Sequence, residues 1–218
     1  MLSAGGSMKA VLFDLDGTLT NTIDDIADSM NHALRLYNLP EHTVEEYKYM
    51  VGNGARKIAE RAVGEHQEFF HSVLQAYQKQ YETHNAVKTR AYDGIPELLQ
   101  KLMAKGIRIC VLSNKPHADT LTVVSHYFPD VRFDAVQGQI EGIPIKPDPA
   151  GAFMLSEKLG IKPSDFAYLG DTNVDMECAR NAGMHPYGVL WGFRKADELL
   201  NAGAEALLST PSELFRYL

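Results

Sequence analysis

The chain has few cysteines, no long apolar run and only one tryptophan. Its two cysteines, Cys110 and Cys178, match neither a metal-ligand spacing nor a disulfide framework, so we expect both to be buried, reduced thiols. No apolar stretch approaches the roughly 20 residues that a membrane-spanning helix needs. The first residues also lack the basic start and apolar stretch of a signal peptide. We therefore expect a cytoplasmic protein without a membrane partner.

Positive charge is also scarce. Lys and Arg number 21 against 28 Asp and Glu, which gives a formal net charge of -7, and the basic residues are scattered along the chain. Binding to a nucleic-acid backbone depends on clustered positive charge. We therefore expect no nucleic-acid partner. For the oligomeric state, the expectation is a monomer or a homodimer.

What the sequence does contain is a series of short apolar runs with helical stretches between most of them. The runs lie at 9–13, 107–112, 133–136, 166–169 and 187–190. Continuous apolar runs of this length are typical of buried parallel strands. Gly106 and Gly160 each follow a helical stretch, at positions where a left-handed cap would end the helix. The pattern predicts an α/β protein with a Rossmann-like parallel sheet and helices on both faces.

The segment 21–90 interrupts this alternation. Apolar residues recur with helical spacing in 23–34 and again in 70–81, and no strand pattern separates them. Thr43 is followed three residues later by Glu46, which is typical of a capping box at the start of a helix. We therefore expect an inserted α-helical cap. The expected division is a flexible leader at 1–7, a catalytic core at 8–20 and 91–218, and the cap at 21–90.

Polar residues gather where the predicted strands end. Open parallel sheets bind ligands outside the carboxyl ends of their strands. Each of these residues alone has an ordinary explanation as a cap, a turn or a solvated loop residue. Together they would place several carboxylates and one ammonium at the same edge of the sheet. The residues are Asp14 and Asp16, Ser113 and Asn114, Lys146, and Asp171 and Asp175.

Carboxylates that lie this close together need a counter-charge to stay ionised. Mg²⁺ favours carboxylate oxygens, water and phosphate oxygens, which this set of residues could supply. Zn²⁺ would need His or Cys residues at definite spacings, and the sequence does not contain them. The sequence therefore predicts a magnesium site.

These residues, in this order, resemble the four motifs of the haloacid dehalogenase superfamily. Asp14-Leu15-Asp16-Gly17-Thr18 resembles the first motif, Ser113 the second, Lys146 the third, and Gly170-Asp171 with Asp175 the fourth. The resemblance spans residues 8–218. It is strongest to the phosphoglycolate phosphatase-like branch, whose members carry an α-helical cap after the first strand.

The resemblance implies hydrolysis of a small phosphate monoester through an aspartyl-phosphate. Asp14 would be the nucleophile, and Asp16 would act first as a general acid and then as a general base. Dehalogenase activity is disfavoured, because members that cleave carbon–halogen bonds lack an aspartate equivalent to Asp16. The phosphate would be held by Ser113, Asn114 and Lys146. The metal would be bound by the carboxylates of Asp14 and Asp171 and by the backbone carbonyl of Asp16. Asp175 would orient these ligands.

The substrate is expected to be a small phosphorylated metabolite, with 2-phosphoglycolate as the best single choice. Pyrophosphatase, nucleotidase and β-phosphoglucomutase-like mutase activities remain open, because the fold and the motifs do not select the substrate. A regulatory protein that binds a phosphorylated ligand is the non-enzyme alternative. Such a protein would be expected to have lost a catalytic carboxylate, whereas Asp14, Asp16 and Asp171 are all present.

One segment of the predicted cap could reach the substrate. Gly52 and Gly54 would let the backbone approach a ligand closely, with Asn53 between them. Arg56 could pair with a substrate carboxylate. The alternative is an ordinary loop between two helices with a solvated arginine. We take Gly52, Asn53, Gly54 and Arg56 as the candidate specificity residues.

Overall fold

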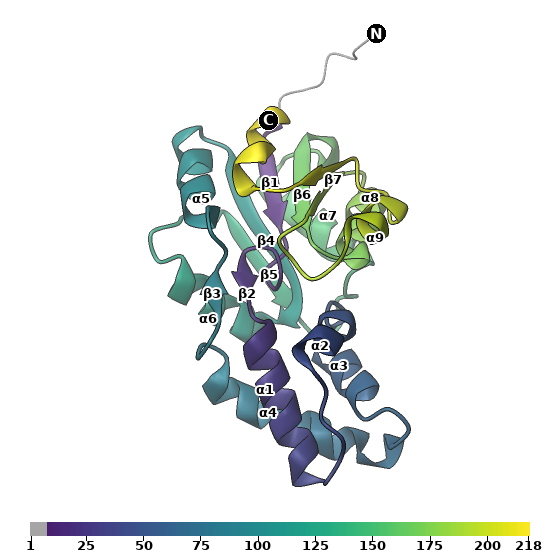
Figure 1. Cartoon of the computed structure of the whole chain (residues 1–218). Helices are drawn as coiled ribbons and strands as arrows, with labels where there is room; N and C mark the ends of the chain where they lie inside the picture. The colour runs from purple at the N-terminus through teal and green to yellow at the C-terminus, as the bar shows by residue number, and fades with distance from the viewer. Residues whose placement is uncertain (1–7) are drawn as a thin grey trace.

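A computed structural model describes residues 8–218, so the expected leader at 1–7 lies outside the described residues (Figure 1). Its main sheet has six parallel strands in the order β5-β4-β1-β6-β7-β8. This confirms the predicted parallel α/β fold, although the sequence patterns gave no sign of β8. The strands are β1 (Ala10–Phe13), β4 (Arg108–Pro116), β5 (Ala135–Gln139), β6 (Phe166–Gly170), β7 (His185–Val189) and β8 (Ala206–Leu208).

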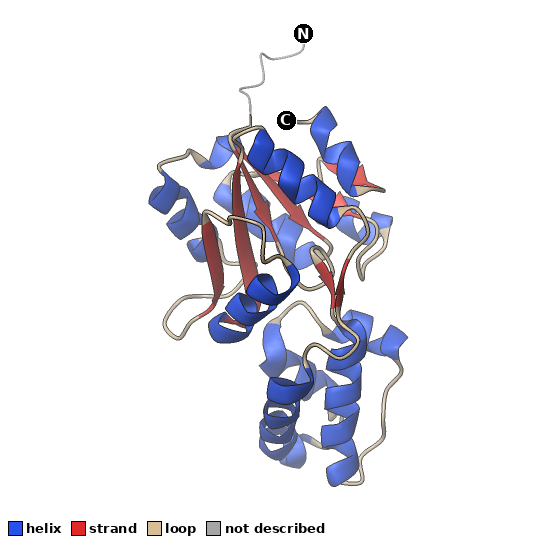
Figure 2. Ribbon diagram, turned by 90° about the vertical axis from the view of Figure 1, so that its left-hand side faces the viewer, coloured by secondary structure: helices blue, strands red, loops and turns tan. Residues whose placement is uncertain are grey.

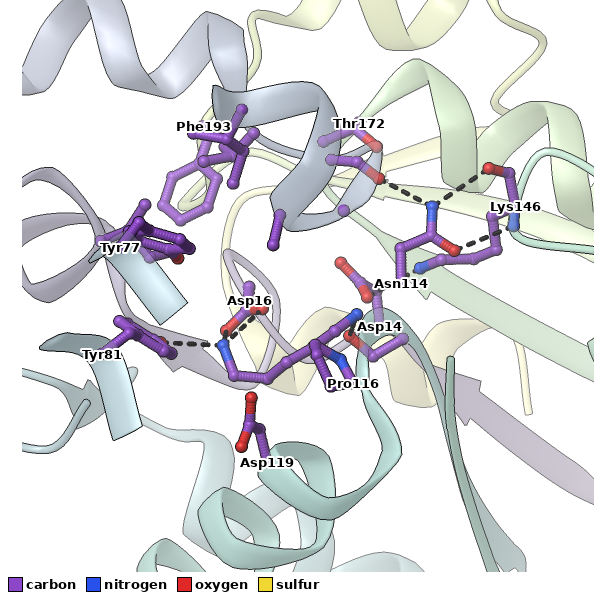
Figure 3. A pocket seen from close by; sticks show the side chains of 18 of the residues that line it. Asp14, Asp16, Tyr77, Tyr81, Asn114, Pro116, Asp119, Lys146, Thr172 and Phe193 are labelled. Carbon is purple, nitrogen blue, oxygen red and sulfur yellow. Dashed lines mark hydrogen bonds and ion pairs between the residues drawn. The ribbon is translucent and has the colours of Figure 1, made fainter. Parts of the chain in front are cut away.

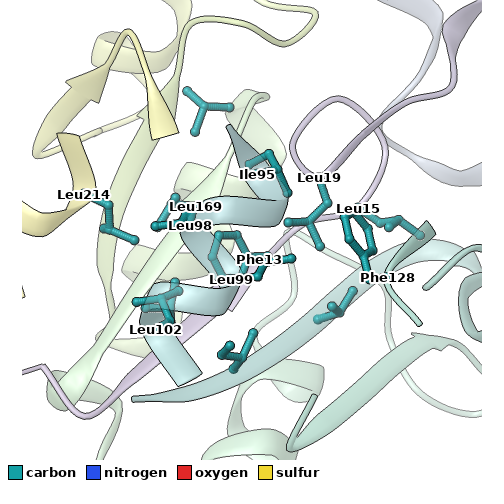
Figure 4. Packing of buried hydrophobic residues seen from close by; sticks show 14 of the residues in the cluster. Phe13, Leu15, Leu19, Ile95, Leu98, Leu99, Leu102, Phe128, Leu169 and Leu214 are labelled. Atoms are coloured by element: carbon teal, nitrogen blue, oxygen red, sulfur yellow. The ribbon is translucent and has the colours of Figure 1, made fainter. Parts of the chain in front are cut away.

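Helices cover both faces of the sheet. Alternate residues of β1 enter different cores. Val11 and Phe13 share one core with α5, α6 and η3 (Figure 4). Ala10 and Leu12 share the other core with α7 and α8. Burial on both faces explains why β1 is apolar throughout. These elements are α5 (Ile95–Ala104), α6 (His117–Tyr127), α7 (Ala150–Leu159), α8 (Asn173–Ala182) and η3 (Pro211–Arg216), with η2 (Pro163–Asp165) and α9 (Ala196–Asn201) beside them.

A second group of helices lies beyond the carboxyl ends of the strands (Figures 1 and 2). It has its own apolar core, in which Met30, Tyr47 and Val73 are buried. Thr43 and Glu46 form both reciprocal bonds of the expected capping box. The group, called the helical bundle below, consists of α1 (Ile23–Leu36), α2 (Val44–Met50), α3 (Gly54–Ala62), η1 (Gln67–Phe69) and α4 (Phe70–His84).

Two short antiparallel strands, β2 (Thr20–Asn21) and β3 (Arg90–Ala91), carry the chain into and out of the helical bundle. Asp25, near the start of α1, binds the segment that leaves the helical bundle to the segment that enters it. Its carboxylate accepts hydrogen bonds from the backbone amides of residues 87–89 at 2.8 to 3.0 Å. The two segments that connect the bundle to the sheet are therefore held together.

Both cysteines are buried and free, as expected, with Cys110 in β4 and Cys178 in α8. Gly106 and Gly160 have left-handed backbone conformations, with φ of 71° and 64°, and they follow α5 and α7 as predicted. Within residues 8–218, no helix is long and apolar enough to cross a membrane.

Candidate active site

The structure brings Asp14, Lys146 and Asp175 together at the carboxyl edge of the sheet. Asp14 follows β1, and its amide donates to the carbonyl of Leu169 in β6 at 2.9 Å. The Nζ of Lys146 lies 2.7 Å from Oδ1 of Asp14 and 2.7 Å from Oδ1 of Asp175. It also donates to the carbonyl of Leu112 at 3.1 Å. One buried ammonium therefore fixes an oxygen of each carboxylate.

Asp171 and Asp175 lie where β6 passes into α8. The second oxygen of Asp175 accepts from the amide and the hydroxyl of Thr172, at 3.1 and 2.7 Å, which caps the helix. Oδ2 of Asp171 accepts from the amide of Phe193 at 2.8 Å, and Oδ1 lies 3.4 Å from the hydroxyl of Thr18. Both carboxylates are thus oriented by neighbouring loops.

Two glycines make room for Asp171. A Cβ on Gly17 would lie 2.2 Å from an Asp171 carboxylate oxygen, and a Cβ on Gly192 would lie 2.2 Å from its Cβ. Gly17 also has φ of 93°, a conformation that other residues rarely adopt. The loops at residues 17 and 192 can therefore enclose Asp171 only because neither carries a side chain.

The three acidic groups form a site suited to a hard cation. Oxygens of Asp14, Asp171 and Asp175 all lie within 4.8 Å of one another, and the three residues are buried. Burial, together with the charge of Asp175, raises the pKa of Asp14 to about 7. Burial and the charge of Asp14 raise the pKa of Asp171 well above its ordinary value. Lys146 alone does not balance three carboxylates, so these residues fit a divalent cation that prefers oxygen ligands.

Lys146 stays positively charged in this setting. Burial by itself would lower its pKa, but the nearby carboxylates of Asp14 and Asp175 outweigh burial and raise the pKa above its ordinary value. The residue can therefore supply a fixed positive charge at the edge of the sheet.

Asp16 is held by a lysine that the sequence analysis missed. The Nζ of Lys115 lies 3.1 Å from each carboxylate oxygen of Asp16. It also donates to the hydroxyl of Tyr81 in α4 at 2.8 Å. Lys115 directly follows Ser113 and Asn114 in the sequence, and this position at the end of a predicted strand could have identified it as a site residue. Tyr81, by contrast, was assigned only to the apolar stripe of its helix, because its contact with the core depends on how the bundle docks.

The predicted phosphate-binding residues differ in their surroundings. Ser113 is buried, and its hydroxyl accepts from the amide of Lys115 at 3.1 Å, which leaves the hydroxyl hydrogen free to donate. The side chain of Asn114 is engaged at both ends. Its Oδ1 accepts from the amide of Lys146, and its Nδ2 donates to the carbonyls of Lys146 and Gly52 at 3.0 and 2.9 Å. Asn114 therefore joins two loops to the sheet.

A cavity of about 350 Å³ lies between the sheet edge and the helical bundle (Figure 3). Asp14 and Lys146 lie at its core end, and Tyr77 and Tyr81 lie on the bundle side. Its lining also includes Asp16, Ile26, Val51, Gly52, Gly54, Ala55, Ile58, Gln78, Glu82, Ser113, Asn114, Lys115, Pro116, Asp119, Thr172, Asp175 and Phe193.

Of the four candidate specificity residues, Gly52 and Gly54 line the cavity. Asn53 instead accepts a hydrogen bond from Arg61 at 2.9 Å. Arg56 is exposed on α3, with its guanidinium carbon 4.8 Å from the centre of the Phe70 ring. The structure therefore brings two of the four to the cavity, and Arg56 lies outside it.

The chain is similar to known hydrolases in sequence and in structure. Residues 11–189 match the haloacid dehalogenase-like hydrolase family. A phosphoglycolate phosphatase from Nitrosospira multiformis is 31% identical, with 92% of this chain and 91% of that protein covered. An N-acetylmuramic acid 6-phosphate phosphatase from Pseudomonas aeruginosa is also 31% identical, over 97% and 95% of the two chains. A solved structure from Lactobacillus delbrueckii subsp. bulgaricus has a TM-score of 0.90 and 29% identity, covering 97% and 98%.

Proposed function

The chain belongs to the haloacid dehalogenase-like hydrolase family, and we propose that it is a Mg²⁺-dependent phosphatase that hydrolyses a small phosphate monoester. Relatives with phosphatase names over almost the whole chain support this reaction. The observation that carries the proposal is the position of Asp14, which lines the cavity with one carboxylate oxygen held 2.7 Å from the ammonium of Lys146.

Asp14 is the nucleophile. With one oxygen anchored to Lys146, the other can attack phosphorus, forming an oxygen–phosphorus bond as the bond to the ester oxygen breaks. Asp16 donates a proton to the departing alkoxide. It then takes a proton from the water that hydrolyses the aspartyl-phosphate, which releases phosphate and regenerates Asp14. Lys115 keeps Asp16 oriented throughout, because it contacts both carboxylate oxygens.

Asp14, Asp171 and the backbone carbonyl of Asp16 would hold Mg²⁺, and Asp175 would orient the site. The bound ion would supply positive charge to the phosphate and lower the repulsion between the phosphate and the Asp14 carboxylate. Lys146 and the Ser113 hydroxyl bind the phosphoryl oxygens, since both line the cavity beside Asp14. Asn114 supports this arrangement by holding the backbone of Lys146.

The regulatory alternative is less well supported, since every carboxylate that the reaction needs is present. Asp14, Asp16 and Asp175 line the cavity, and the buried Asp171 lies within 4.8 Å of Asp14 and Asp175. Pyrophosphatase, nucleotidase and phosphosugar mutase activities share the same core chemistry and differ in the leaving group. The names of the relatives make 2-phosphoglycolate one substrate to be tested.

The proposal is tested by incubating purified protein with Mg²⁺ and a panel of phosphate monoesters that includes 4-nitrophenyl phosphate. Phosphate release that is lost in Asp14→Asn is the expected result. Product analysis separates a phosphatase, which releases phosphate, from a mutase, which returns an isomeric phosphate ester. Turnover by a folded Asp14→Asn protein at the wild-type rate would contradict the mechanism.

A further inference from the structure

The cavity offers no unpaired cation to a substrate carboxylate. Within the described part of the chain, Lys115 and Lys146 are the positively charged residues that line it. Lys115 is paired with Asp16, and Lys146 is paired with Asp14 and Asp175. Arg56, the residue expected to meet a carboxylate, is exposed outside the cavity. A carboxylated leaving group would therefore have to compete with the protein's own carboxylates.

Two further residues bring additional negative charge to the lining of the cavity. They are Asp119, half-buried in the first turn of α6, and Glu82, on α4. Among residues 8–218, neither carboxylate has a hydrogen-bond or ion-pair partner. Burial raises the pKa of Asp119 above its ordinary value. The positive charge of Lys115 lowers this pKa by a smaller amount, and the negative charges of Glu82 and Asp16 add to the rise. A substrate carboxylate beside Asp119 and Glu82 would be repelled.

An apolar wall adjoins these carboxylates. The rings of Tyr77 and Tyr81 stack, with centroids 5.5 Å apart and planes 26° from parallel. Phe193 lies near them (Figure 3). Ile26 and Ile58 also line the cavity. A surface of this kind suits the carbon skeleton of a ligand, while a few polar groups fix its orientation.

We infer that the substrate is the phosphate ester of a neutral, hydroxylated compound such as a sugar or polyol, and that Asp119 is a specificity-determining residue that accepts a hydrogen bond from a substrate hydroxyl. The inference rests on the proposed function, because the phosphate must be placed at Asp14. Asp119 is suited to this role because its carboxylate is partly shielded from water, lies in the cavity and has no partner within the described chain. Hydroxyl groups donate to such an acceptor, whereas a carboxylate cannot.

The inference predicts a measurable substrate preference. Glycerol 3-phosphate and 3-phosphoglycerate share a three-carbon skeleton and differ in carrying a hydroxymethyl group or a carboxylate. We expect kcat/KM for glycerol 3-phosphate to exceed that for 3-phosphoglycerate by at least tenfold, which is the scale of one hydrogen bond to a charged group. We also expect 2-phosphoglycolate to be hydrolysed less efficiently than glycerol 3-phosphate.

The role of Asp119 is tested with Asp119→Asn, which keeps the shape and removes the charge. We expect the preference for glycerol 3-phosphate over 3-phosphoglycerate to fall at least fivefold, through a higher KM for the first substrate and a lower KM for the second. Asp130→Asn is the matched control, because Asp130 is exposed and lies outside the cavity. This control should leave the preference unchanged.

With 4-nitrophenyl phosphate as the reference substrate, the outcomes distinguish a failure of the proposed function from a failure of the inference alone. If no phosphate ester is hydrolysed with Mg²⁺, the proposed function fails, and the inference fails with it. If the aryl phosphate is hydrolysed but the carboxylated substrates are equal or preferred, or neither three-carbon substrate reacts, the inference alone is overturned. A preference that Asp119→Asn leaves unchanged would overturn the role of Asp119.

Discussion

The ammonium of Lys115 lies 3.1 Å from both carboxylate oxygens of Asp16. Lys115 comes from the sheet, yet it also donates to the Tyr81 hydroxyl of the helical bundle at 2.8 Å. The orientation of Asp16 is thus linked to the position of the bundle. A proton-transferring group must be well aligned with its substrate to be effective, so this contact should matter for turnover.

Lys115→Met should lower kcat at least tenfold, because it removes the group that orients Asp16 and leaves that carboxylate without its partner. Tyr81→Phe removes only the hydroxyl and should have a smaller effect. Steady-state kinetics with 4-nitrophenyl phosphate would measure both. Lys79→Met is the control, since Lys79 is exposed on the same helix as Tyr81 and lies outside the cavity. Wild-type kcat in Lys115→Met would contradict the assigned role.

Asp14→Asn should abolish turnover and leave the fold intact. The amide keeps the size of the carboxylate but lacks its nucleophilic charge, and its oxygen can still accept from Lys146. Phosphate release and circular dichroism would test the two parts of this prediction. Asp130→Asn, an exposed change of the same kind, should retain full activity.

Activity should require Mg²⁺, and chelation should remove it. Ca²⁺ should inhibit, because its longer bonds and higher coordination number would displace the Asp14 carboxylate from its line of attack. A thermal melt gives a readout that is independent of turnover. Mg²⁺ should raise the melting temperature of the wild type and have a much smaller effect on Asp171→Asn. Full activity in metal-free buffer would contradict the proposed site.

Gly192→Ala should weaken the response to Mg²⁺, because the added methyl group would push against Asp171. The concentration of Mg²⁺ needed for half-maximal activity should rise at least tenfold, and overpacking should cost about 1 to 3 kcal/mol of stability. Gly106→Ala separates these effects. It meets no atom within 4 Å but is strained by its φ of 71°, so it should lose stability and keep the wild-type Mg²⁺ dependence.

Arg56→Ala should have little effect on kcat/KM for either 2-phosphoglycolate or 4-nitrophenyl phosphate. The side chain is exposed and lies over Phe70, so its loss should reduce stability slightly rather than change substrate binding. Parallel kinetics with the two substrates would check this. A selective loss of tenfold or more with 2-phosphoglycolate would show that Arg56 enters the cavity during turnover.

The features predictable from the sequence were those that depend on local pattern. Buried strands and the capping box at Thr43 have local signals, and strand ends in a parallel sheet gather at one edge, which placed Asp14 near Asp175. Strand limits were less accurate: β4 continues to Pro116, beyond the predicted end at residue 112. Its extension consists of polar residues that follow the apolar run, so periodicity could not detect it.

The contacts between the bundle and the sheet were not predictable. Arg56 was expected to meet a substrate carboxylate, with a solvated arginine as the alternative; it is exposed on α3, which begins at Gly54, and lies outside the cavity. The position of Tyr81 beside Lys115 likewise depends on how α4 docks against the sheet. No local signal in one chain specifies such a contact between segments that are distant in sequence.

The central position of β1 has a consequence for how the chain is made. β1 is the first strand of the main sheet to leave the ribosome, but its two neighbours are β4 and β6. Until residues 166–170 have been synthesised, one edge of β1 has no strand to pair with, and the amide of Asp14 lacks its partner at Leu169. Unpaired apolar edges promote aggregation. Chains that stop before β6 should therefore accumulate as insoluble or chaperone-bound fragments, and Asp14, the proposed nucleophile, can reach its final position only late in synthesis.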